Sequence, residues 1–191
     1  MLMLKTGMLL YHGSYVAVEK PDLDKCARFK DFGQGFYLTT SLTQARSFAR
    51  LSLGKARGKS MISGTENTAW VSVFRVADIT QLKCFVFKDA DKDWLHCIVA
   101  HRRREPFEEV RQQMKDYDVI GGKVANDDTN FTIMNYIIGG YGQMGSKSAD
   151  NFCISLLIPQ RLKEQFCFRS RKAIACLKYL RCEKIECGGG K

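Results

Sequence analysis

Two stretches decide which fold we expect from this chain: Met8-Leu9-Leu10-Tyr11-His12-Gly13 and Asp31-Phe32-Gly33-Gln34-Gly35-Phe36-Tyr37-Leu38-Thr39. The first is an apolar run, expected to form a strand over residues 9–12, that ends on a histidine followed by a glycine. Because glycine has no Cβ, a ligand can approach the backbone of Gly13 closely, beside the side-chain donor of His12. The second stretch presents Phe36 and Tyr37 directly after two glycines, so that a ring can form a flat wall. Such a wall suits a nicotinamide ring.

These residues resemble the ADP-ribosyltransferase superfamily, in particular its poly-ADP-ribose polymerase and diphtheria-toxin-like branch. There a histidine-glycine pair ends one strand, and a glycine-x-glycine-aromatic-tyrosine segment forms the next. More closely, residues 8–182 are similar to an uncharacterised bacterial family related to that superfamily. Four stretches carry this likeness: Tyr11-His12-Gly13-Ser14, residues 31–40, Val124-Ala125-Asn126-Asp127 and Glu164-Gln165-Phe166-Cys167-Phe168.

The resemblance implies that NAD is the substrate and assigns roles to particular residues. It implies that His12 hydrogen-bonds a ribose hydroxyl, that the backbone of Gly13 holds the carboxamide, and that Tyr37 stacks on the nicotinamide. Phe48, eleven residues after Tyr37, has the spacing of a second aromatic in related transferases; alternatively it packs in the core. Asn126 and Asp127 match the bacterial family at the cleft rim, or serve only as a turn and helix cap. The expected NAD-binding set also contains Ser14, Gly33, Gly35, Phe36 and Gln165.

The last motif departs from the pattern of the related transferases, which carry a glutamate that stabilises the positive charge developing on the sugar. This chain offers Glu164 and Gln165. Because strand side chains alternate, Gln165 faces away from Phe166 and Phe168 if those aromatics face the core, which favours Gln165 in the cleft. Breaking the nicotinamide–ribose bond gives an oxocarbenium-like sugar, and a glutamine brings no charge to offset it. We therefore expect transfer of one ADP-ribose unit, with His12, Tyr37 and either Gln165 or its rival Glu164 as the catalytic residues.

Length and composition suggest one domain over residues 1–191, since domains usually hold about 100–200 residues. Expected strands and helices do not alternate regularly, which favours an α+β fold. The resemblance refines this to an ADP-ribosyltransferase-like split β-sandwich with flanking helices around an NAD cleft. No stretch approaches the roughly 20 apolar residues of a membrane helix, and no leader is visible, so we expect a cytoplasmic protein without a membrane partner. The eight cysteines lack C-x-x-C spacing, which predicts reduced thiols and no metal site.

The chain carries a formal charge of +10, which favours anionic partners such as NAD or nucleic acid, although a merely solvated basic face is the alternative. His96 and His101 lie off the apolar stripe of a helix expected over residues 91–103, so we expect both to be exposed. The basic residues that stand out are His101-Arg102-Arg103-Arg104, Arg169, Arg171, Lys172, Lys178, Arg181 and Lys184.

The leading hypothesis is an NAD-dependent mono-ADP-ribosyltransferase of the toxin or effector kind that modifies an unknown protein or nucleic-acid target. Two alternatives stay open. One is a catalytically inactive NAD- or ADP-ribose-binding module of the same fold, because Gln165 stands where related enzymes have a glutamate. The other is a basic nucleic-acid-binding protein in which the motif match is incidental, although it lacks aromatics interleaved with the basic runs.

Overall fold

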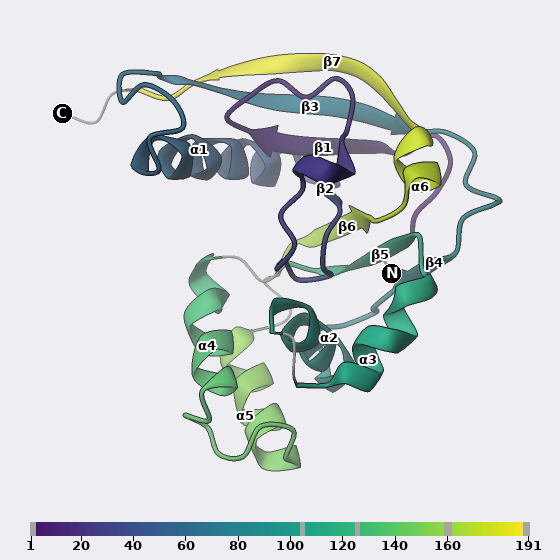
Figure 1. Cartoon of the computed structure of the whole chain (residues 1–191), viewed down its shortest axis with the longest axis vertical. Helices are drawn as coiled ribbons and strands as arrows, with labels where there is room; N and C mark the ends of the chain where they lie inside the picture. Colours follow the sequence, from purple (N-terminus) through teal and green to yellow (C-terminus); the bar gives the residue numbers. More distant parts are fainter. Residues whose placement is uncertain (1–2, 104–105, 125–126, 159–161, 189–191) are drawn as a thin grey trace.

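The computed structural model describes residues 3–103, 106–124, 127–158 and 162–188, without the side chains of residues 127 and 128. Seven strands form one sheet in the order β4-β5-β6-β2-β1-β3-β7 (Figure 1). The β4–β5 pair is parallel, and the other neighbouring strands are antiparallel. This sheet with flanking helices is compatible with the expected α+β class. The strands are β1 (Leu9–Ser14), β2 (Phe36–Thr39), β3 (Thr68–Val76), β4 (Cys84–Val86), β5 (Val119–Lys123), β6 (Glu164–Phe168) and β7 (Leu177–Glu186).

The helices divide between the two ends of the sheet. In Figure 1, α1 lies along β1 and β3, whereas α2 to α5 gather below the end formed by β4, β5 and β6. A short α6 leads from β6 into β7. The helices are α1 (Leu42–Gly58), α2 (Lys92–Arg102), α3 (Glu108–Gln113), α4 (Asp127–Ile137), α5 (Lys147–Leu157) and α6 (Arg171–Ala175), with 3-10 turns η1 (Leu23–Lys25) and η2 (Met114–Asp116).

Helix α1 begins as its sequence predicts and ends later. The Ser41 side chain accepts a hydrogen bond from the Gln44 amide, as expected of a capping box. From its sequence alone, a helix is expected over residues 42–51, with a loop over residues 54–68, but the helix continues to Gly58. Its buried residues Ala45, Ala49, Leu53 and Ala56 keep one face against the sheet, and this tertiary contact stabilises the extra turns.

The two faces of the sheet have different coverings. Phe36 and Leu38 of β2 point to one face, where a buried cluster includes Leu10, Phe74, Phe166 and Phe168; we call it the Phe36 face. Tyr37 and Thr39 point to the other, the Tyr37 face, since strand side chains alternate. On the Tyr37 face, α1 covers the β1–β3 end, and a second cluster around Trp94, Leu95 and Ile98 of α2 covers the β5–β6 end.

The expected end of β1 at His12 is wrong. The strand continues through Gly13 to Ser14, because these residues pair with Val71 and Trp70 of β3. With β2, however, β1 pairs only at Tyr11 and Thr39. The two strands therefore part beyond Tyr11, and we call this place the β1–β2 split. It almost divides the sheet into a half with β4, β5, β6 and β2 and a half with β1, β3 and β7.

In the described part of the chain, no helix combines the length and the apolar character needed to cross a membrane. All eight cysteines are free thiols. Burial raises the pKa of Cys97, Cys153 and Cys167 to about 12, so these three remain protonated and behave as small apolar side chains.

Candidate functional site

Gly13 turns its backbone polar groups into the β1–β2 split. The Val76 amide donates to the Met8 carbonyl, and in an antiparallel ladder hydrogen-bonded and non-hydrogen-bonded pairs alternate. The backbone groups of every second residue from Met8 onward, up to His12 and Ser14, therefore hydrogen-bond to β3. Gly13 lies between His12 and Ser14. Its N–H and C=O consequently point toward β2, two residues beyond the last β1–β2 pair at Tyr11.

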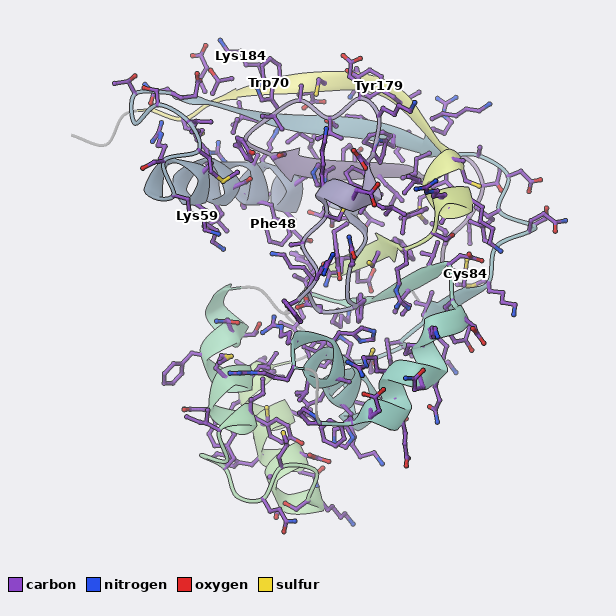
Figure 2. All side chains as sticks on the ribbon, in the orientation of Figure 1. Phe48, Lys59, Trp70, Cys84, Tyr179 and Lys184 are labelled. Carbon is purple, nitrogen blue, oxygen red and sulfur yellow. The ribbon has the colours of Figure 1, made fainter. Side chains whose placement is uncertain are left out.

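Helix α1 packs directly on Gly13. A Cβ at this position would lie 2.0 Å from the Ala45 carbonyl oxygen and 2.7 Å from the Ala49 nitrogen, so the contact requires a glycine. Phe48 precedes Ala49 and therefore leaves the helix close to Gly13. The Phe48 ring is half-buried and is not one of the apolar residues packed on the buried clusters of the described chain. Figure 2 shows Phe48 below α1, away from β7.

Tyr37 fixes the loop that precedes β2. Its hydroxyl donates to the Gly33 carbonyl over 2.7 Å and accepts from the Phe32 amide over 2.9 Å. Burial raises the pKa of Tyr37 well above its usual value, so the phenol is neutral. Gly33 has a φ of +81°, and a Cβ there would lie 2.8 Å from the His101 ring; a Cβ at Gly35 would lie 2.4 Å from the Cys167 sulfur. Both glycines are therefore needed for packing in this loop.

His12 points to the Phe36 face, opposite Tyr37. Its Nδ1 donates to the Tyr37 carbonyl over 2.8 Å, across the split, and its ring lies 4.3 Å from the Phe36 ring. Burial lowers the pKa of His12, so the imidazole is neutral at pH 7. The buried Ser14 shares the Phe36 face, and its hydroxyl accepts from the Val16 amide. The structure thus brings His12 to the split, but on the opposite face of the sheet from Tyr37 and Gln165.

Strand β6 has the phase that its sequence predicts. Gln165 lies on the Tyr37 face, beside Thr39 of β2, and Phe166 and Phe168 lie on the other face. Glu164 is directed elsewhere: its carboxylate lies 3.2 Å from the ammonium of Lys123 on β5. The Thr39 hydroxyl lies 2.9 Å from the Glu164 carbonyl oxygen and 2.9 Å from Gln44 Oε1 at the start of α1, so these two acceptors share its single proton.

A buried network behind Gln165 escaped the sequence analysis. Gln165 is 6% exposed, and its Nε2 donates to Asp31 over 2.8 Å. The other Asp31 oxygen accepts two hydrogen bonds from Arg102, at 2.7 and 3.1 Å, and Arg102 also donates to Asn130 of α4. Because the Gln165 nitrogen is engaged, its Oε1 remains as an acceptor for a ligand. Asp31 stood in a quoted motif and Arg102 in a basic run, but no local pattern connects residues so far apart in the chain.

Two residues of the expected NAD-binding set cannot be placed in full. Asn126 lies outside the described residues, and so does the side chain of Asp127, the first residue of α4. Over the part of the chain that the structure describes, no group of three or more His, Cys, Asp or Glu side chains is placed to hold a metal ion.

The expected exposure of His96 and His101 is wrong. His96 stacks on Phe107 at 3.9 Å, and its Nε2 lies 2.9 Å from the buried carboxylate of Asp150. His101 is only 7% exposed. Helix α2 is covered by the sheet, α3 and α5, so positions off its apolar stripe are also buried. His96 tolerates burial because its Nε2 faces the Asp150 carboxylate, and on the His101 ring it is Nδ1 that finds a partner, the Cys97 carbonyl.

Comparison with family models gives a match over residues 8–179 to the family DUF3990, which is described as a protein of unknown function. No curated protein matches the chain. The matched range begins just before β1 and reaches into β7, so it contains Gly13, Tyr37, Phe48, Gln165 and the network behind Gln165. The match covers most of the sequence, and the chain belongs to the DUF3990 family.

Proposed function

We propose that the protein is an NAD-dependent mono-ADP-ribosyltransferase that binds NAD at the β1–β2 split. The observation that carries this proposal is the direction of the Gly13 backbone, which turns one donor and one acceptor into the split beside Phe48. A carboxamide offers the complementary acceptor and donor. Tyr37 and Gln165 lie on the sheet face that α1 covers at Gly13, so the rings and the ribose-binding amide can approach one ligand. The near-division of the sheet suits the proposed split β-sandwich.

In the proposed reaction the ribose–nicotinamide bond breaks, the nicotinamide leaves as a neutral molecule, and the sugar carbon bonds a nucleophile of the acceptor, which is a protein or a nucleic acid. The nucleophile's proton passes to solvent. Gln165 Oε1 accepts a hydrogen bond from a ribose hydroxyl, as a carboxylate would. Asp31 is a positioning residue: it accepts from the Gln165 nitrogen and so places a carboxylate directly behind the amide that contacts the sugar. His12 is a positioning residue that holds the Tyr37 carbonyl across the split from the opposite face of the sheet.

A second candidate function is a module that binds NAD or ADP-ribose without transferring it. The observation in its favour is the state of Gln165, which is uncharged, buried and already bonded to Asp31, whose own charge is shared with Arg102. Such an arrangement binds a ribose hydroxyl but stabilises an oxocarbenium less than a free carboxylate would.

The test uses NAD labelled on its adenine, incubated with the full chain and a cell lysate. We expect release of nicotinamide together with covalent label on a macromolecule. Phe48→Ala should weaken both, whereas Phe152→Ala, which removes an exposed ring on α5, should leave both unchanged. Saturable NAD binding without nicotinamide release would favour the binding module. A parent protein that does not bind NAD would overturn the proposal.

A further inference from the structure

A pocket of about 390 Å³ lies between the loop before β2 and the helices α2 and α3. Five cationic side chains line it, and we call it the basic pocket: Arg28, Arg103, Arg111, Lys115 and Arg169. No carboxylate belongs to its lining, as far as the described residues go. Like charges brought together repel one another, and their field raises the local concentration of anions.

Two of these cations are held in place. Arg111 is paired with Glu108 on its own helix, and an Nη1 hydrogen bond from Arg169 reaches the Met114 carbonyl. The Arg169 Nε is buried and has no hydrogen-bond partner in the described chain. Arg28, Arg103 and Lys115 are exposed. The pocket therefore combines the hydrogen-bonded guanidinium of Arg169 with exposed cations, which suits an anion with several oxygens.

His101 supplies an independent observation that points to a ligand. His101 lines the pocket and only 7% of its surface is exposed. Its Nε2 nevertheless has no hydrogen-bond partner among the described residues. Its Nδ1 donates to the Cys97 carbonyl over 2.8 Å, which leaves Nε2 as the acceptor of a neutral ring. Burial lowers the pKa of His101 to about 4 against the opposing hydrogen bond to the Cys97 carbonyl; the charges of Arg169 and Arg111 lower the pKa further, and Asp31 raises it slightly. A buried acceptor without a donor is costly unless a ligand provides one.

We propose that the basic pocket binds a phosphate monoester of nucleotide size. A monoester has a second pKa near 6, so it carries several acceptor oxygens for the arginines and one exchangeable proton that a phosphate oxygen can share with His101 Nε2. The volume lies in the usual range of ligand pockets and exceeds the needs of phosphate alone. Phe29, 56% exposed at the lining, adds an apolar ring against which a base can stack.

The basic pocket is distinct from the β1–β2 split. Of the residues expected to bind NAD, only Gly33 lines it, and neither Gly13, Phe48 nor Gln165 does. The inference therefore stands without the proposed transferase activity.

The test is equilibrium binding of AMP to the full chain, with adenosine as the ligand that lacks the phosphate. We expect adenosine to bind at least about tenfold more weakly, and Arg28→Gln with Arg103→Gln to weaken AMP by at least about tenfold, because each lost cation removes a charged hydrogen bond. The matched control is Arg75→Gln with Lys178→Gln, which removes the same charge from a directly paired position on β3 and β7. Equal AMP binding by the pocket variant and the parent, or equal binding of adenosine and AMP, would overturn the proposal.

A second measurement does not depend on any variant. NMR titration of the histidine ring signals should show the pKa of His101 rising when AMP is bound, because the phosphate then faces Nε2. An unchanged His101 titration at saturating AMP would also overturn the proposal. Hexaribonucleotides with a 5′-phosphate or a 5′-hydroxyl identify the source of the monoester. Binding of the phosphorylated hexamer more tightly than AMP assigns the site to a nucleic-acid end, and weaker binding assigns it to a free nucleotide.

Discussion

The β1–β2 split beside Gly13 and the basic pocket beside His101 offer a ligand very different groups. At the split, the polar groups are those of the Gly13 backbone and of the buried Gln165 amide, and the proposed walls are the rings of Tyr37 and Phe48. In the basic pocket, the polar groups are charged side chains from four separate segments of the chain. The two regions meet at Gly33, which lines the pocket and whose carbonyl accepts from Tyr37. Neutral groups held by a sheet suit an amide and a sugar, whereas converging cations suit a phosphate.

The largest expected effect comes from Asp31→Ala, which removes the carboxylate that Gln165 and Arg102 share. It leaves the largely buried Arg102 without its carboxylate and the Gln165 nitrogen without its acceptor. We expect the free energy of unfolding to fall by about 3–5 kcal/mol, the range for a buried ion pair that loses one partner. Urea unfolding measures this, and the exposed Asp24→Ala serves as the control. A loss below about 1 kcal/mol would mean that the loop does not depend on this network.

A smaller effect, specific to the pocket side, is the pH dependence of stability. The pKa of His101 is about 4 in the folded protein and near 6.5 in the unfolded chain, so between these values the unfolded chain binds the extra proton. Its contribution is therefore fully present above about pH 6.5 and is lost as the pH falls toward 4, by about 3 kcal/mol at most. The lowered pKa of His12 acts with the same sign.

Urea unfolding at pH 7 and at pH 4.5 measures this loss, and His101→Gln should make the difference between the two pH values smaller. An unchanged difference in the variant would show that His101 is not the buried base. Saturating AMP should also reduce the loss if the phosphate shares a proton with His101.

Phe48→Ala should weaken ligand binding at the β1–β2 split alone. Loss of one stacked ring is expected to weaken NAD binding by about 1–3 kcal/mol, the range for a base stacked on an aromatic side chain. Isothermal titration with NAD measures the change, and the melting temperature shows whether α1 is intact. The half-buried ring contacts none of the three buried clusters, so stability should change little. Unaltered NAD affinity would place the nicotinamide away from α1.

The split and the basic pocket also differ in how much of their structure could be predicted from the sequence. The alternation of Phe166 and Phe168 predicts the face on which Gln165 lies, and the structure confirms it. The roles of Tyr37 and Phe48, which come from contiguous motifs, stay predictions. The end of β1 could not be predicted, because pairing with β3 decides it. Helix α3 has no buried residue, so its sequence lacks the apolar stripe from which a helix is predicted. The basic pocket depends on α3, and its residues converge only in the folded chain.

The smallest effect, and the sharpest test of the split, concerns Gln165. Removing its single directed hydrogen bond in Gln165→Ala should lower NAD cleavage by about 0.5–1.5 kcal/mol, or more if the bond strengthens as charge develops. Gln165→Glu alone would place a second carboxylate against Asp31, only one hydrogen bond away, and the repulsion offsets the benefit of the new charge. Adding Asp31→Asn moves the charge from residue 31 to residue 165 and keeps a donor between them; it also removes the carboxylate that pairs with Arg102, so nicotinamide release is compared at a temperature where both variants are folded. Nicotinamide release should therefore be higher in the double variant than in Gln165→Glu, while Glu164→Gln, which disturbs only the pair with Lys123, should release nicotinamide like the parent. Loss of release in Glu164→Gln, with both Gln165 variants unaffected, would make Glu164 the residue that stabilises the sugar.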